Sequence, residues 1–370
     1  MLCFKGRDGV NFPVDFDIHE EQQVQEMRFE YYHAGLDDVR KLSVDGTVPR
    51  SLHFSHWQGN ETPTAVKADT STEIALNVVG SPDYDHLTQG IELVTNNHFD
   101  TDGVLSVWTM LTGERAGELR SELIAAAENG DFSAYSGENA VRASIIIQGS
   151  EQPDPNEQTI SPLAAQLAGH PLTDEARAYE LVLPEVERVL TRTGDYEPLW
   201  REGWQRVAAA LESFARGASH VEEQEDVGLS IITIAPELYG RAGFDPERPA
   251  TPYTAIMHHA KGSLYLIALP FNGKWTYRVD YPYYSWAETV VRPHVRRRDF
   301  APLVAMLNEV ERNQEGRWRL DGNELASAVK FMDQGGRLAA SSLTLDAVAR
   351  ELRASLLLDT ETPVAGAYSG

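Results

Sequence analysis

The stretch IELVTNNHFDTDGVLS, residues 91–106, decides the fold. Its first five residues form an apolar run typical of a short buried strand, and apolar residues then recur at helical spacing over residues 104–111. A second strand is expected at residues 50–55, and the capping-box sequence Thr-Ser-Thr-Glu at residues 70–73 predicts the start of a helix. Alternation of short strands with helices predicts an α/β domain whose sheet is mostly parallel.

The rest of the chain extends this domain and adds a smaller one. Residues 198–216 carry one apolar stripe at helical spacing, which predicts a long helix joining the two domains. Beyond Gly217, runs rich in β-branched and aromatic residues predict further strands and a smaller α/β domain. We therefore expect an N-terminal arm over 1–46, the larger domain with its connector helix over 47–216, the smaller domain over 217–358 and a flexible tail over 359–370.

Composition limits the functions open to the chain. Its 370 residues include 56 acidic and 32 basic side chains, a formal net charge of -24, so binding to long duplex nucleic acid is not expected. No apolar run reaches the roughly 20 residues that cross a bilayer, so membrane insertion is not expected either. The single cysteine, Cys3, cannot form an internal disulfide and fits a cytoplasmic protein. A small anionic molecule at a local basic pocket is compatible with this charge, and the number of subunits stays open.

Three chemically active side chains gather within five residues at the strand–helix junction: His98, Asp100 and Asp102. His98 and Asp100 share one side of an extended chain, and the carboxyl end of a parallel strand is where α/β folds place ligands. This set suits a divalent ion, Mn²⁺ above all, with Mg²⁺, Zn²⁺ and Fe²⁺ also open. A plainer interpretation is that Asp102 caps the next helix, Asp100 lines a turn and His98 satisfies a hydrogen bond.

Further candidates lie on either side of this junction. His56 follows the strand expected at 50–55 and would join the metal ligands if that strand neighbours residues 91–95; a buried, hydrogen-bonded histidine is the alternative. In the smaller domain, two concentrations of basic residues predict a binding site for a phosphate or carboxylate group of the substrate. The alternative is that these residues form ion pairs with acidic side chains on the surface. These predicted substrate-binding residues are His258, His259, Arg292, Arg296 and Arg298.

Two motifs resemble those of a known superfamily. The run HFDTDGVLS, residues 98–106, is similar to the first motif of the DHH phosphoesterases, a strand ending in His-x-Asp-x-Asp-Gly before a helix. Residues 335–345, GGRLAASSLTL, resemble the signature of the DHH-associated C-terminal domain, with Arg337 where that signature has histidine. The third DHH motif, Asp-His-His, is absent. The chain as a whole also resembles a family of bacterial proteins of unknown function.

This resemblance implies a metal-dependent phosphoesterase. His98, Asp100 and Asp102 would bind one or two Mn²⁺ ions and act in catalysis, Asp131 would match the second-motif aspartate that bridges the metals, and Arg337 would contact substrate. We therefore predict a cytoplasmic hydrolase that acts on a small phosphorylated or anionic molecule, such as a short nucleotide. Two alternatives stay open: a metal or nucleotide sensor without catalysis, and a metal-dependent enzyme of another class in a biosynthetic pathway.

Overall fold

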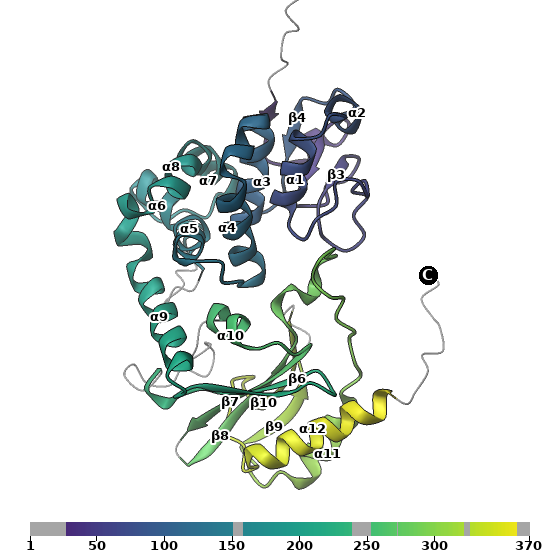
Figure 1. Cartoon of the computed structure of the whole chain (residues 1–370), viewed down its shortest axis with the longest axis vertical. Coiled ribbons are helices and arrows are strands. Elements are labelled where there is room, and N and C mark those ends of the chain that lie inside the picture. Colours follow the sequence, from purple (N-terminus) through teal and green to yellow (C-terminus); the bar gives the residue numbers. More distant parts are fainter. Residues whose placement is uncertain (1–26, 151–157, 239–252, 272, 322–325, 361–370) are drawn as a thin grey trace, which may run out of the picture.

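The computed structural model describes residues 27–150, 158–238, 253–271, 273–321 and 326–360. They form two α/β domains, the first around parallel sheet A and the second around mixed sheet B (Figure 1). The long helix α9 (Glu197–Ala215) leads from the helices of the first domain to the first strand of sheet B. The predicted class, two α/β domains joined by a long helix, is confirmed.

The first domain begins with short strands and continues with helices. Its strands are β1 (Arg28–Phe29), β2 (Leu42–Val44), β3 (Leu52–Phe54) and β4 (Leu93–Thr95). Its helices before α9 are α1 (Ser71–Val79), α2 (Tyr84–Thr88), α3 (Thr101–Thr112), α4 (Arg120–Phe132), α5 (Glu138–Gln148), α6 (Pro162–Ala168), α7 (Glu175–Val182) and α8 (Val186–Thr191).

Sheet A is parallel throughout, with strand order β1-β4-β2-β3. Leu42 of β2 pairs with Leu52 of β3 on one side and with Val94 of β4 on the other. β2 and β4 are buried along their whole length, as parallel strands packed under helices are. Because the strands point the same way, the residues that follow β2, β3 and β4 emerge at one edge of the sheet.

The helices that border this edge begin at defined caps. Thr70 Oγ1 accepts the backbone N–H of Glu73 at 3.2 Å, so α1 starts where the capping box predicts. Helix α3 packs on α1 and on α4, and its inward residues Val104, Leu105 and Val107 are fully buried. This packing sets the first turn of α3, the first turn of α1 and the end of α4 close to one another.

The second domain is a sheet with helices on both faces. Its elements are β5 (His220–Gln224), β6 (Leu229–Thr233), α10 (Tyr253–His259), β7 (Leu264–Phe271), β8 (Lys274–Asp280), η6 (Tyr283–Trp286), α11 (Ala301–Val310), β9 (Gly316–Leu320), β10 (Ser327–Asp333) and α12 (Leu345–Thr360). Sheet B has the order β5-β6-β7-β8-β10-β9 and is antiparallel except between β6 and β7. One hydrophobic cluster joins it to α11 and α12, and another joins it to α9 and α10.

Residues 27–46 differ from the expected N-terminal arm. They carry β1 and β2, and β2 lies inside sheet A, between β3 and β4. A three-residue strand with two apolar side chains gives too short a pattern to be recognised. Residues 1–26 of the expected arm and 361–370 of the expected tail lie outside the described residues, and the domain boundaries stay predictions. Among the described helices, none combines the length and the hydropathy that a bilayer span requires.

Candidate metal centre

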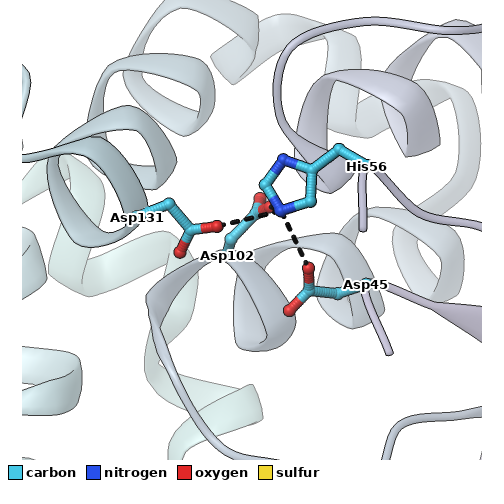
Figure 2. A group of neighbouring side chains, drawn as sticks. All are labelled: Asp45, His56, Asp102 and Asp131. Atoms are coloured by element: carbon cyan, nitrogen blue, oxygen red, sulfur yellow. Dashed lines mark ion pairs between the residues drawn. The ribbon is translucent and has the colours of Figure 1, made fainter. Parts of the chain in front are cut away.

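Three consecutive strand ends of sheet A deliver acidic and imidazole side chains to one place. Asp45 directly follows β2, His56 lies two residues after β3, and Asp102 lies in the first turn of α3. Asp131, near the end of α4, completes the buried group, and Figure 2 shows the four side chains converging. Their candidate ligand atoms all lie within 4.8 Å of one another.

His56 is the centre of this buried group. Its Nε2 atom lies 3.1 Å from Asp131 Oδ2, 3.5 Å from Asp45 Oδ1 and 3.7 Å from Asp102 Oδ2 (Figure 2). Its Nδ1 atom lies 2.6 Å from the backbone oxygen of Asp69, which accepts the Nδ1 proton. Such a hydrogen bond fixes the tautomer and turns Nε2 toward the ligand position, as in metal-binding histidines.

A second group lies beside the first and is more open. His98 Nε2 lies 2.8 Å from Asp45 Oδ2 and 3.2 Å from Asp100 Oδ2. The side chains of His98 and Asp100 are 25% and 28% exposed, whereas that of His56 is fully buried. The described residues therefore offer two candidate cation positions, one enclosed and one facing the surface.

Asp45 belongs to both groups, because each of its oxygens faces a different histidine. Its backbone is left-handed, with φ of 63°, a conformation that costs an L-residue roughly 1–2 kcal/mol. Gly46 follows it, and a Cβ there would overlap the side-chain oxygens of Asn96 and Asn97. The sequence prediction missed Asp45; the signal was an Asp-Gly pair directly after the apolar Leu-Ser-Val run at 42–44.

The capping interpretation also holds in part. Asp100 is the N-cap of α3, since its Oδ1 accepts the N–H of Gly103 at 2.7 Å. Asp102 caps α1 rather than its own helix, because its carboxylate accepts the N–H groups of Ser71 and Thr72 at 2.7 and 2.8 Å. Capping uses Asp100 Oδ1 and leaves Oδ2 directed at His98. Because each carboxylate oxygen has two lone pairs, an aspartate that caps a helix can still bind a cation.

Burial and mutual charge shift the pKa values of this centre. Burial alone would lower the pKa of His56, but the three neighbouring carboxylates raise it to about 10. Burial would likewise lower the pKa of His98, which Asp100 and Asp45 raise to about 12. Burial, reinforced by the charge of Asp45, raises the pKa of Asp102 to about 7, and burial raises that of Asp131 as well. Without a metal ion, protons on the two histidines therefore balance the negative charge of the buried aspartates.

The residues fit a divalent metal ion. Asp45 Oδ2, His56 Nε2 and His98 Nε2 are buried, and they face only other ligand-type atoms of the two groups, at 2.8 Å between His98 and Asp45 and 3.1 Å between His56 and Asp131. Buried polar atoms are normally satisfied, and buried charges are paired or coordinate metals. Carboxylates with one imidazole per position suit Mn²⁺, Fe²⁺ or Zn²⁺, and they do not distinguish among these ions.

Neighbouring side chains hold the open group in place. Tyr179 of α7 donates a hydrogen bond to the backbone oxygen of His98 at 3.0 Å and accepts one from Asn96 Nδ2 at 3.0 Å. Trp57, 37% exposed, has its ring centroid 5.3 Å from that of His98 and 5.2 Å from that of Trp286. An exposed indole thus borders the accessible side of the centre.

The structure brings the predicted ligands together but leaves most of the predicted substrate-binding residues elsewhere. His98, Asp100, Asp102, Asp131 and His56 all belong to the two groups. Arg292 is paired with Asp69 and Glu128 at 2.8 Å each. The other five residues lie on α10, between η6 and α11, and in the turn after β10, and their role stays a prediction: His258, His259, Arg296, Arg298 and Arg337.

Fold and site together define an α/β protein with a buried aspartate–histidine centre able to hold metal. The chain belongs to the family of unknown function DUF6687, whose model matches residues 25–359. No curated protein matches the sequence.

One solved structure gives a distant likeness, the pGpG-specific phosphodiesterase PggH from Vibrio cholerae. The two share 10% sequence identity with a TM-score of 0.33, over 86% of this chain and 98% of that one. A TM-score of this size does not establish a common fold, and the substrate of that enzyme says nothing about the substrate of this chain.

Proposed function

We propose that this protein is a divalent-metal-dependent hydrolase that acts on a small phosphorylated or anionic molecule, such as a short nucleotide. The observation that supports it most is Asp45, whose two oxygens face two separate histidine-containing groups. Two adjacent cation positions with a shared carboxylate suit the transfer of a phosphoryl group, in which both attacking and leaving oxygens need stabilisation.

Each ligand has a defined part in this proposal. His56, Asp102 and Asp131 would hold an ion in the enclosed position, and His98 with Asp100 would hold one at the surface. A bound divalent ion lowers the pKa of a water molecule toward neutrality and stabilises negative charge on a phosphoryl oxygen. The exposed sides of His98 and Asp100 leave room for a substrate to approach there.

Charge favours a small substrate over a polymer. The chain carries a formal net charge of -24, so a long polyanion would be repelled over most of its surface. Arg292 is already paired with two carboxylates, so in this proposal ions at the centre supply positive charge for a phosphate.

The test is turnover of a panel of model phosphomonoesters, phosphodiesters and dinucleotides with added Mn²⁺. We expect hydrolysis that a chelator abolishes and that Asp131→Asn reduces by at least about 100-fold. Asp131 suits this purpose because its carboxylate has one ion-pair partner among the described residues, His56, and caps no helix. Asp83→Asn, at an exposed residue whose side chain makes no capping hydrogen bond, is the matched control.

The same experiment separates the alternatives. No turnover on any ester, combined with Mn²⁺-dependent nucleotide binding, would favour a sensor. Absence of metal from the purified protein, with no uptake of Mn²⁺, Zn²⁺ or Fe²⁺ on addition, would contradict the proposal as a whole.

A further inference from the structure

A segment of the second domain reaches the enclosed metal ligands of the first. We call residues 283–292, which comprise η6 and the six residues after it, the strap. In Figure 1 the light-green chain between β8 and α11 rises from sheet B to the lower edge of the first domain. The strap meets His56 directly: Glu288 N–H donates to the backbone oxygen of His56 at 2.7 Å. The ring of Trp286 packs edge-on against the imidazole at a centroid distance of 5.0 Å.

Asp69 connects the strap to the other side of the same imidazole. Its backbone oxygen accepts the Nδ1 proton of His56, as described above. Its carboxylate accepts the backbone N–H groups of Val290, Val291 and Arg292 at 2.5, 2.7 and 3.1 Å. The guanidinium of Arg292 adds an ion pair at 2.8 Å, and only 4% of the Asp69 side chain is exposed. The residue that orients His56 is therefore itself held by four donors from the second domain.

Glu288 fixes the loop between His56 and Asp69. Its carboxylate accepts hydrogen bonds from Gly59 N at 3.0 Å and Asn60 Nδ2 at 2.8 Å, and it pairs with Lys67 Nζ at 3.1 Å. The loop carries no helix or strand of its own, and these contacts join it to the second domain. Within the described residues, no hydrogen bond, ion pair or ring contact joins the strap directly to His98 or Asp100; the link to His98 is indirect, through the ring of Trp57, which contacts both Trp286 and His98.

We infer that the strap positions His56, so that metal affinity at the enclosed group depends on docking of the second domain while affinity at the open group does not. The inference rests on the proposed function only in requiring metal at these residues; it requires no turnover. Residues that orient a metal-binding histidine typically change metal affinity by 10–100-fold when they are removed. Asp69 and Glu288 are positioning residues in this sense, since neither has a ligand atom in either group.

The test compares Asp69→Asn with Asp38→Asn in the full-length protein. In the wild type the Asp69 carboxylate accepts hydrogen bonds from backbone N–H groups of the strap. The first substitution replaces one carboxylate oxygen by an amide nitrogen, which is itself a donor and cannot accept these hydrogen bonds, so the strap should detach. Asp38 is an exposed acid paired with Arg50 in the same domain, with 89% of its side chain exposed, and it serves as the matched control. The measurements are Mn²⁺ titration calorimetry for the two positions and the visible spectrum of bound Co²⁺.

We expect Asp69→Asn to weaken one of two Mn²⁺ binding events by about 10–100-fold, to leave the other within about twofold, and to shift the Co²⁺ bands. Asp38→Asn should change neither affinity nor spectrum. A purely structural role for the strap would lower the melting temperature without a spectral shift. Hydrogen exchange of the amides at 288–292 reports independently whether the strap has detached.

Two results would overturn the inference. One is faster exchange at 288–292 with both affinities and the Co²⁺ spectrum unchanged; the other is equal weakening at both positions. If Asp69→Asn does not fold, Glu288→Gln, which keeps the backbone N–H to His56, is judged by the same measurements. If the wild-type protein binds no metal, the proposed function fails too, whereas wild-type binding that the strap variants leave unchanged overturns this inference alone.

Discussion

At the scale of single residues, Asp45 determines whether the centre is one site or two. Its left-handed backbone, followed by Gly46, turns the carboxylate so that Oδ1 faces His56 and Oδ2 faces His98. Ser71 Oγ donates to Oδ1 at 2.9 Å and helps to hold this rotamer. Loss of the Asp45 charge should therefore affect both groups, unlike loss of Asp131 or Asp100.

Asp45→Asn tests this sharing. The amide keeps the shape of the side chain but removes its negative charge from both positions and turns an N–H₂ group toward one of them, so Mn²⁺ binding at both positions should fall by at least about tenfold. Elemental analysis after dialysis, together with calorimetry, gives the stoichiometry. Retention of two tightly bound ions per chain would show that Asp45 is not a ligand.

Metal binding should release protons. The neighbouring carboxylates raise the pKa of His56 to about 10 and that of His98 to about 12, so both imidazoles carry protons at pH 7. A metal ligand must be the neutral imidazole, so each ion displaces a proton, and apparent affinity rises with pH until it reaches about 10 for His56 and about 12 for His98. Calorimetry in buffers of different ionisation enthalpy should yield at least about two protons per two ions, since Asp102 and Asp131, whose pKa values are also raised, add to the protons from the two imidazoles. Binding heats that do not depend on the buffer would contradict the protonation of these histidines.

Trp57 should contribute to substrate affinity if the substrate carries a base. Its exposed ring lies beside His98, and stacking of a base on an aromatic side chain is worth about 1–3 kcal/mol. We expect Trp57→Ala to raise KM for a dinucleotide by roughly 5- to 150-fold, with Trp57→Phe intermediate. KM for a phosphoester without a ring should not change, and an equal effect on both substrates would argue against stacking.

At the scale of elements, the centre forms because β3, β2 and β4 pair in parallel, so that the residues that follow them meet at one edge of sheet A. The sequence prediction named the β4–α3 junction, His56 and Asp131 as candidates, because each has a local pattern or a motif around it, and the structure brings these residues together. It did not find Asp45, because the position of β2 between β3 and β4 follows from long-range pairing that no local pattern carries. The strap contacts likewise join residues more than 200 positions apart, which sequence spacing alone does not predict.

The close approach of β2 to β4 gives a prediction at this scale. Gly46 faces Asn96 and Asn97 so closely that an added methyl group would overlap their side-chain oxygens. Gly46→Ala should push β4 away from β2 and misplace Asp45 relative to His98, with a loss of about 1–3 kcal/mol in unfolding free energy. Denaturant titration and Mn²⁺ calorimetry measure the two effects. Gly59→Ala, where nothing lies within 4 Å of the added carbon, gives the comparison for backbone strain alone, since Gly59 has φ of 80°.

At the scale of the whole molecule, the two domains meet around the candidate ligands. Besides the strap, Thr254 of α10 accepts a hydrogen bond from Asn129 Nδ2 at 3.1 Å, and His258 packs on Tyr135 at 5.0 Å between ring centroids. Both contacts flank Asp131 near the end of α4. In a chain with a formal net charge of -24, four clustered carboxylates oppose folding unless cations compensate them. Metal should therefore stabilise the folded protein, the first domain directly and the second through its contacts.

Scanning calorimetry with Mn²⁺ at about 100 times Kd tests this coupling. Binding at that excess contributes about 2.7 kcal/mol per site, or about 5.4 kcal/mol for the two sites, which corresponds to a rise of roughly 11–22 °C in the Tm of a domain of this size. The first domain should show this rise in full, because it supplies every candidate ligand, and the transition of the second should rise less, through its contacts with the first domain. Asp69→Asn should separate the two transitions further, whereas Asp45→Asn, which weakens binding at both positions by at least about tenfold, should reduce the Mn²⁺ effect on both to about half or less. A rise of equal size in Asp45→Asn would mean that Mn²⁺ acts on the acidic surface rather than at this centre.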